Sequence, residues 1–167
     1  MEITILCKIV DNFGDIGVAY RLAKNLKIYY PLLKINLIVS NLSAFHNINS
    51  LVSTEKSEQF IEGIFVYDWN DFKHCQQVFL QNDGEKLSII LECFQCGRPD
   101  WLEEILFEKK LSRTVQIIMI DYLTAEDYAE DFHCLQSLTR SSKVKKVNFM
   151  PGFTKKTGGL IIGQDWA

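Results

Sequence analysis

The sequence has no apolar run that approaches the roughly 20 residues of a membrane-spanning helix. After Met1 it also lacks the basic, apolar and cleavable segments of a secretion signal. Positive charge is not in excess, because 18 Lys and Arg against 21 Asp and Glu give a formal net charge of −3. That balance favours neither nucleic acid nor an anionic membrane as a partner. We therefore expect a cytoplasmic protein without nucleic-acid or membrane partners.

A disulfide framework is also missing, since the five cysteines are odd in number and irregularly spaced. There is no internal repeat, low-complexity segment or internal linker. Of the 167 residues, 47% are hydrophobic and 23% charged, an ordinary balance for one globular domain with a buried core. The lysine-rich run 143–146 is too short to alter this picture, and we expect it to be a solvated loop.

Apolar, β-branched runs predict buried strands. They cover 3–10, 34–40, 63–69, 86–92 and 115–122. Helical periodicity begins at Ile16 and stops before Pro31. Further helices are predicted over 71–81, 98–110 and 124–135, with Thr124 and Asp127 as a capping pair. Alternating strands and helices predict an α/β, Rossmann-like parallel sheet with helices on both faces.

Polar side chains follow several of these strands. They are the pairs Asp11/Asp15 and Asp121/Tyr122 and the single residues Asn41 and Glu92. Because sites in parallel sheets gather beyond the carboxyl ends of the strands, we expect these side chains to converge on one edge.

The segment 10–26, VDNFGDIGVAYRLAKNL, places two aspartates where nucleotide-binding folds have a phosphate loop. Gly14 and Gly17 match only part of the G-x-G-x-x-G pattern, and a carboxylate at Asp15 would repel phosphate. On this turn alone, Asp15 is most simply a helix cap. One cap does not require Asp11 as well, and two nearby carboxylates repel each other unless a cation lies between them. The pair thus predicts a site for a metal, an amine or a guanidinium.

The segment 92–99, ECFQCGRP, contains a C-x-x-C pair that suits either redox chemistry or half of a zinc site. No second ligand pair has suitable spacing, so zinc is disfavoured, and Cys93 continues an apolar run. We interpret Cys93 and Cys96 as small buried residues.

In DYLTAEDYAEDFH (121–133), the later acidic residues suit a solvated helix face, and His133 suits a structural hydrogen bond. Four aromatic side chains are more simply core residues than ligand platforms: Trp69, Phe94, Trp101 and Phe153.

Four segments in order, DNFGDIGV, LECFQCGRPDW, IDYLTAEDYAEDFH and FMPGFTKKTGGL, resemble the N-terminal half of the elongation factor P arginine rhamnosyltransferases. The resemblance implies a GT-B fold of two Rossmann-like domains, with the acceptor protein on the N-terminal one. It also implies inverting transfer of rhamnose from dTDP-rhamnose to an arginine of elongation factor P, without a metal or other cofactor. The donor would bind mostly to the C-terminal domain.

Carried over by motif, the two essential aspartates of the family fall on Asp11 and Asp15, with Asp15 matching the general base. Further matches imply substrate-binding or site-shaping residues, with no individual role assigned. They are Asn12, Phe13, Gly14, Gly17, Glu92, Tyr122, Glu126, Thr157, Gly158 and Gly159. Phe13 replaces a frequent tyrosine and Asp121 a common glutamate.

Family members are much longer than this chain. We therefore expect residues 1–160 to form the acceptor-binding domain, 161–167 to begin a linker, and the donor-binding domain to be absent. The first hypothesis is that the chain is a truncated transferase that is inactive alone. The alternatives are a non-catalytic acceptor-binding remnant and the N-terminal domain of another GT-B glycosyltransferase. A C-x-x-C redox protein is a further rival and would need a thiol of lowered pKa.

Overall fold

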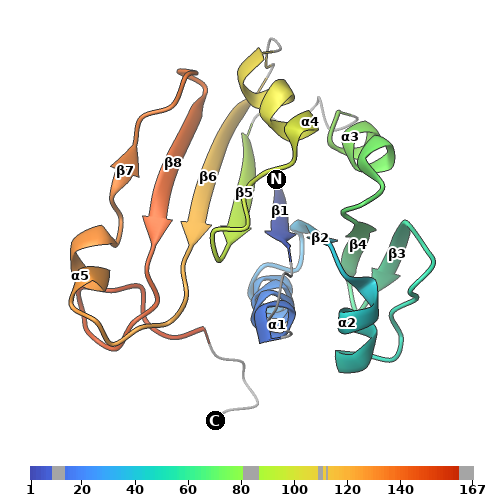
Figure 1. Cartoon of the computed structure of the whole chain (residues 1–167), viewed down its shortest axis with the longest axis horizontal. Helices are drawn as coiled ribbons and strands as arrows, with labels where there is room; N and C mark the ends of the chain where they lie inside the picture. Colours follow the sequence, from blue (N-terminus) through green and yellow to red (C-terminus); the bar gives the residue numbers. More distant parts are fainter. Residues whose placement is uncertain (9–13, 81–86, 109–110, 112, 162–167) are drawn as a thin grey trace.

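A computed structural model describes residues 1–8, 14–80, 87–108, 111 and 113–161. The predicted α/β class is confirmed, because helices alternate with strands that form one eight-stranded sheet (Figure 1). The strands are β1 (Glu2–Cys7), β2 (Lys34–Val39), β3 (Glu58–Ile61), β4 (Ile64–Asp68), β5 (Leu87–Cys93), β6 (Thr114–Ile120), β7 (Gln136–Ser137) and β8 (Val144–Phe149). The helices are α1 (Gly14–Tyr29), α2 (Leu42–Ile48), α3 (Phe72–Leu80), α4 (Asp100–Glu103) with the π-helical turn η1 (Glu104–Glu108), and α5 (Tyr128–Phe132).

The sheet order is β3-β4-β2-β1-β5-β6-β8-β7. Among the described strands, all inner neighbours pair in parallel, and the two edge strands, β3 and β7, pair antiparallel. β1 is central and pairs with both β2 and β5, so its carboxyl end lies in the middle of the carboxyl edge.

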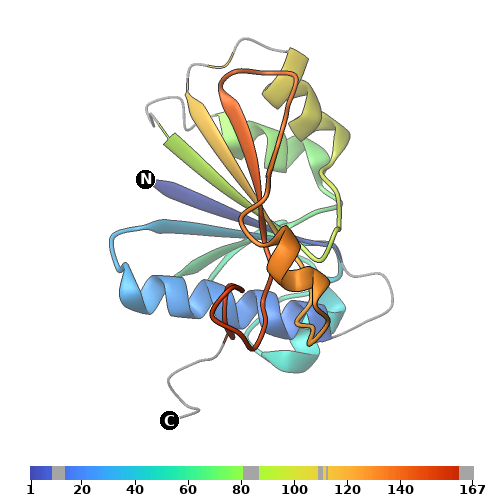
Figure 2. The same ribbon diagram turned by 90° about the vertical axis from the view of Figure 1, so that its left-hand side faces the viewer.

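Helices cover both faces of the sheet, as the apolar patterns predict. One core cluster packs α1 and α2 against one face, through residues such as Ile16, Ala19 and Phe45. The other cluster packs α3 and α4 against the opposite face, through Phe79, Trp101 and Leu102. Figure 2 shows these two helical layers on either side of the twisted strands. The buried positions of Trp69 and Trp101 confirm their assignment to the core.

The prediction of a solvated loop at 143–146 is wrong, because β8 begins at Val144. Val144 is buried, whereas Lys145 is exposed. β8 is covered on its outer side only by the two-residue β7, and lysines commonly occupy strands near a sheet edge. The charge of the lysines thus made β8, which pairs in parallel with β6, resemble a loop in the sequence.

The prediction of a helix over 124–135 is correct only for its middle part, Tyr128–Phe132. α5 begins at Tyr128, and its N-cap residue, Asp127, makes no side-chain capping bond. Thr124 instead accepts a hydrogen bond from the Glu126 amide at 3.1 Å, which closes a local turn. The expected Thr124–Asp127 capping pair is therefore wrong.

Residues 150–159 form a loop closed by backbone hydrogen bonds. Gly158 N donates to Met150 O at 2.8 Å, and Gly152 N donates to Gly159 O at 3.1 Å. A Cβ on Gly158 would lie 2.5 Å from Cζ of Phe149, so the glycine lets the loop lie flat on that ring. Phe153 is 64% exposed on this loop, which makes its assignment to the core wrong.

We expect Gly158→Ala to destabilise the fold by about 1–3 kcal/mol, because the added methyl overlaps the Phe149 ring. Gly159→Ala is the matched control. Its methyl would meet open space but would impose a positive φ of 78° on alanine, at a cost of roughly 1 kcal/mol. Urea unfolding measures both variants. Phe149→Leu should reduce the cost of Gly158→Ala, and equal costs in both backgrounds would contradict the contact.

Candidate functional site

The helix start after β1 places a carboxylate at the centre of the carboxyl edge. Asp15 lies in the first turn of α1, where the helix dipole favours a negative charge. Its side chain is only 7% exposed. The Tyr122 hydroxyl, just beyond β6, donates a hydrogen bond to Asp15 Oδ2 at 2.9 Å. A residue pair 107 positions apart in sequence is therefore joined across the end of β5.

A neutral hydroxyl is required for this bond. Burial, followed by the hydrogen bond to Asp15, raises the pKa of Tyr122 to about 12. The tyrosine therefore stays protonated at neutral pH and acts as a donor. This bond fixes one carboxylate oxygen and so sets the orientation of the Asp15 side chain.

Two aromatic rings stack on each other beside Asp15. The rings of Phe94 and Tyr122 are stacked with centroids 4.5 Å apart and an interplanar angle of 16°. Phe94 is only partly buried, so the structure places at the site a residue that the sequence assigned to the core.

The backbone that carries Phe94 is strained. Phe94 and Gln95 both have positive φ, at 58° and 57°, a region costly for residues with a Cβ. Such strain is found preferentially at functional sites. No sequence signal identified this turn.

Two other side chains predicted to lie at this edge, those of Asn41 and Glu92, make structural contacts. Asn41 accepts a hydrogen bond from the Ala44 amide at 3.0 Å and so caps α2. Glu92 is buried, with Oε2 2.5 Å from Nη1 of Arg98, and Arg98 also contacts Glu103 at 2.7 Å. The carboxylate of Glu92 is thus neutralised by Arg98.

The other residues carried over from the family are spread over the first turns of α1, the surroundings of α5 and the loop 150–159. Gly14 is exposed at the start of α1, and a methyl on Gly17 would make only an ordinary contact with Ile48. Glu126 and Thr157 line a small hollow of about 70 Å³ beside α5. Gly158 and Gly159 shape the closed loop described above. Asp11, Asn12 and Phe13 lie outside the described residues.

The C-x-x-C pair has the wrong electrostatics for a reactive thiol. Burial raises the pKa of the Cys93 thiol well above its usual value and that of Cys96 to about 11. Both are therefore protonated at neutral pH, in agreement with their interpretation as structural residues. Within the described residues, no group of three or more His, Cys, Asp or Glu side chains could hold a metal ion. His133 has the expected structural role, since its Nδ1 accepts from Met150 N at 3.0 Å.

Buried thiols also make the fold sensitive to alkali. Burial raises the pKa of Cys7 from 9.0 to about 12, so the unfolded chain loses this proton at lower pH than the folded one. We expect the free energy of unfolding to fall between about pH 9 and 12, with Cys7 contributing about 1.4 kcal/mol per pH unit. Cys7→Ala should reduce the slope by that amount in urea unfolding at several pH values. The exposed Cys134→Ala is the control, and equal slopes for both variants would contradict the assignment.

Comparisons with known proteins identify the family of the chain. A family model described as Elongation-Factor P (EF-P) rhamnosyltransferase EarP matches residues 3–167. The chain belongs to the EarP family.

Relatives of the family are each named protein-arginine rhamnosyltransferase. The chain is 34% identical to the protein from Shewanella oneidensis over 164 residues, which covers 96% of this chain and 39% of the relative. Identity to the Pseudomonas putida protein is 32%, over 94% of this chain and 38% of the relative. The Pseudomonas aeruginosa protein is 30% identical, over 94% and 39%. The chain therefore spans about two fifths of the length of these EarP-family relatives. No described helix is both long and apolar enough to cross a membrane.

Proposed function

We propose that this chain forms the acceptor-binding domain of a GT-B protein-arginine rhamnosyltransferase. The reaction is inverting transfer of rhamnose from dTDP-rhamnose to an arginine of elongation factor P, without a metal. Membership of the EarP family and the names of the relatives support this assignment. Residues 1–160 form the domain in this proposal, and 161–167 lead towards the donor-binding part.

The observation that carries the proposal is the buried Asp15 carboxylate fixed by the Tyr122 hydroxyl. A guanidinium is charged at any working pH and has delocalised lone pairs, which makes it a poor nucleophile. A fixed carboxylate binds it through charge-assisted hydrogen bonds and orients one nitrogen. The stacked Phe94 and Tyr122 rings offer a flat neighbouring surface for the planar group.

The proposed step balances in charge and atoms. One guanidinium nitrogen forms a bond to the anomeric carbon of rhamnose as the bond from that carbon to the dTDP oxygen breaks. The electrons of the broken bond leave with dTDP, and the proton of the attacking nitrogen passes to a carboxylate. We assign the proton transfer to Asp15 and the holding of the guanidinium to Asp11, while the reverse assignment remains an alternative.

A reconstitution experiment tests the proposal. The 167-residue chain is mixed with, or fused to, the part of the Shewanella oneidensis relative that lies beyond the match, then supplied with elongation factor P and dTDP-rhamnose. Mass spectrometry should show one added deoxyhexose on an arginine with the combined parts and none with either part alone. Binding of elongation factor P without transfer would instead support the acceptor-binding module. Neither binding nor transfer would support another acceptor.

A further inference from the structure

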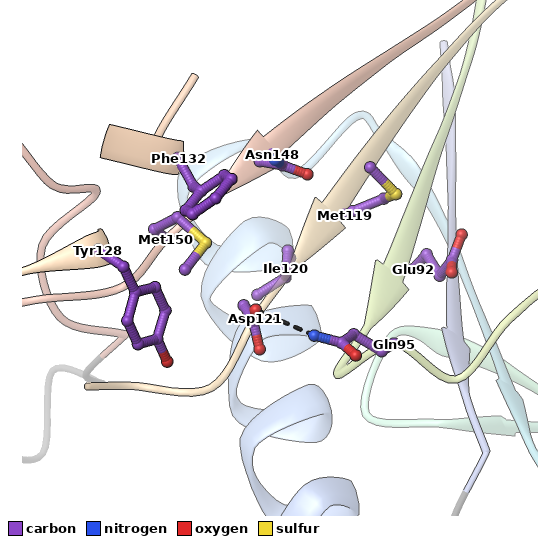
Figure 3. A pocket seen from close by; sticks show the side chains of 9 residues that line it. All are labelled: Glu92, Gln95, Met119, Ile120, Asp121, Tyr128, Phe132, Asn148 and Met150. Atoms are coloured by element: carbon purple, nitrogen blue, oxygen red, sulfur yellow. Dashed lines mark hydrogen bonds between the residues drawn. The ribbon is translucent and has the colours of Figure 1, made fainter. Parts of the chain in front are cut away.

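A pocket of about 440 Å³ lies at the same sheet edge (Figure 3). It opens where β5, β6 and β8 end, and α5 forms one wall. The lining residues are Glu92, Gln95, Met119, Ile120, Asp121, Tyr128, Phe132, Asn148 and Met150. Its volume falls within the range of pockets that bind small ligands or side chains.

The charged residues that line this pocket are both acidic, Glu92 and Asp121. Glu92 forms an ion pair with Arg98, so the net negative charge of the pocket comes from Asp121. Gln95 Nε2 donates to Asp121 Oδ2 at 3.2 Å and Tyr122 N donates to Oδ1 at 2.8 Å. Both donors are neutral groups, so the carboxylate is oriented towards the pocket without losing its charge.

Aromatic side chains form the wall opposite Asp121. Tyr128 and Phe132 are 47% and 46% exposed, and their rings lie edge to face with centroids 6.3 Å apart. Figure 3 shows both rings and the carboxylate of Asp121 bordering the same hollow. Half-exposed rings next to one carboxylate favour a cation with an apolar stem, because the stem packs on the rings and the charge meets the anion.

Asp121 and Tyr122 connect this pocket to Asp15. They are neighbours in sequence, yet Tyr122 reaches Asp15 whereas Asp121 lines the pocket. A chain that crosses the edge at this point would reach both carboxylates with two of its own side chains.

We propose that the pocket binds a second basic side chain, an arginine or lysine, of the same acceptor protein whose arginine meets Asp15. This inference rests on the proposed function for the identity of the acceptor. Such binding would make the domain specific for acceptors that present two basic side chains, one to Asp15 and one to this pocket.

A titration of the 167-residue chain tests the pocket itself. N-acetyl-arginine-amide, the cationic probe, is added to the ¹⁵N-labelled protein, and the amide signals of Tyr128, Phe132 and Asn148 report on this pocket rather than on Asp15. We expect saturable shifts of these signals, and binding at least about tenfold weaker for the neutral isostere N-acetyl-citrulline-amide. Equal binding of both probes, or no shift of these signals, would overturn the proposal.

Two variants locate the charge that is responsible. Asp121→Asn should weaken binding at these signals about tenfold, because it removes the charge and keeps the shape. Asp131→Asn, on an exposed residue of α5 that does not line the pocket, should leave binding unchanged. Unchanged binding in Asp121→Asn would overturn the assignment.

Kinetics of the reconstituted enzyme test the occupant. Asp121→Asn should raise KM for elongation factor P about tenfold and change kcat less than threefold, and an unchanged KM would exclude the acceptor side chain as occupant. If the unaltered reconstituted enzyme transfers no rhamnose, the proposed function fails and the acceptor as occupant fails with it. The titration then still decides whether the pocket binds a cation.

Discussion

Asp15→Asn should lower kcat of the reconstituted transferase by about 100- to 10,000-fold, the range over which a positioned general base contributes. Asparagine keeps the size of the side chain and can still accept the Tyr122 hydrogen bond, but it cannot take a proton. The fold should therefore survive while the chemical step slows. Steady-state transfer to elongation factor P, read by mass spectrometry, gives kcat and KM separately.

The matched control is Asp71→Asn. Asp71 also follows a parallel strand, β4, and its Oδ1 accepts from the His74 amide at 3.2 Å at the start of α3. Asparagine caps helices as well as aspartate does, so activity and stability should change little. Equal losses in both variants would assign Asp15 to capping alone, whereas a loss confined to KM would assign it to acceptor binding.

Arg98→Met should destabilise the fold by about 3–5 kcal/mol, because it leaves the carboxylate of Glu92 buried without a counter-charge. The Glu92 side chain is 8% exposed and its contact with Arg98 is 2.5 Å long. Glu92→Gln combined with Arg98→Met should recover part of the loss, since the amide carries no charge. Urea unfolding at neutral pH measures both variants.

Lys24→Met is the control for this prediction. Lys24 and Glu62 form a pair at 3.6 Å with side chains 44% and 42% exposed. Exposed pairs contribute at most about 1 kcal/mol, so the loss should be small. Similar losses in the free energy of unfolding for Arg98→Met and Lys24→Met would contradict a larger contribution from the buried pair.

Most of the inner strands could be predicted from the sequence, because their apolar runs are bounded by turns and separated by helical patterns. β8 could not, because its lysines suit a solvated loop and its pairing with β6 and β7 is evident from the structure alone. The short α2 was also missed, and with it the reason for Asn41, which caps that helix.

The candidate site was predicted in part. The strand-end pattern identified Asp15, Glu92 and Tyr122, and the structure joins Asp15 to Tyr122 directly. Distances across the sheet, however, are set by strand order, which sequence spacing does not encode. Phe94 does pack against the core, as predicted, but its stacking on Tyr122 was not predicted. The 440 Å³ pocket was not predicted for the same reason, because Asn148, which lines it, lies on β8.

The hydrogen bond between Tyr122 and Asp15 spans 107 residues, with one partner following β1 and the other following β6. Local βα units that form early in folding contain one partner without the other. The proposed reactive arrangement thus arises only when the central strands have all docked. Opening of the β5–β6 pair would separate its two halves.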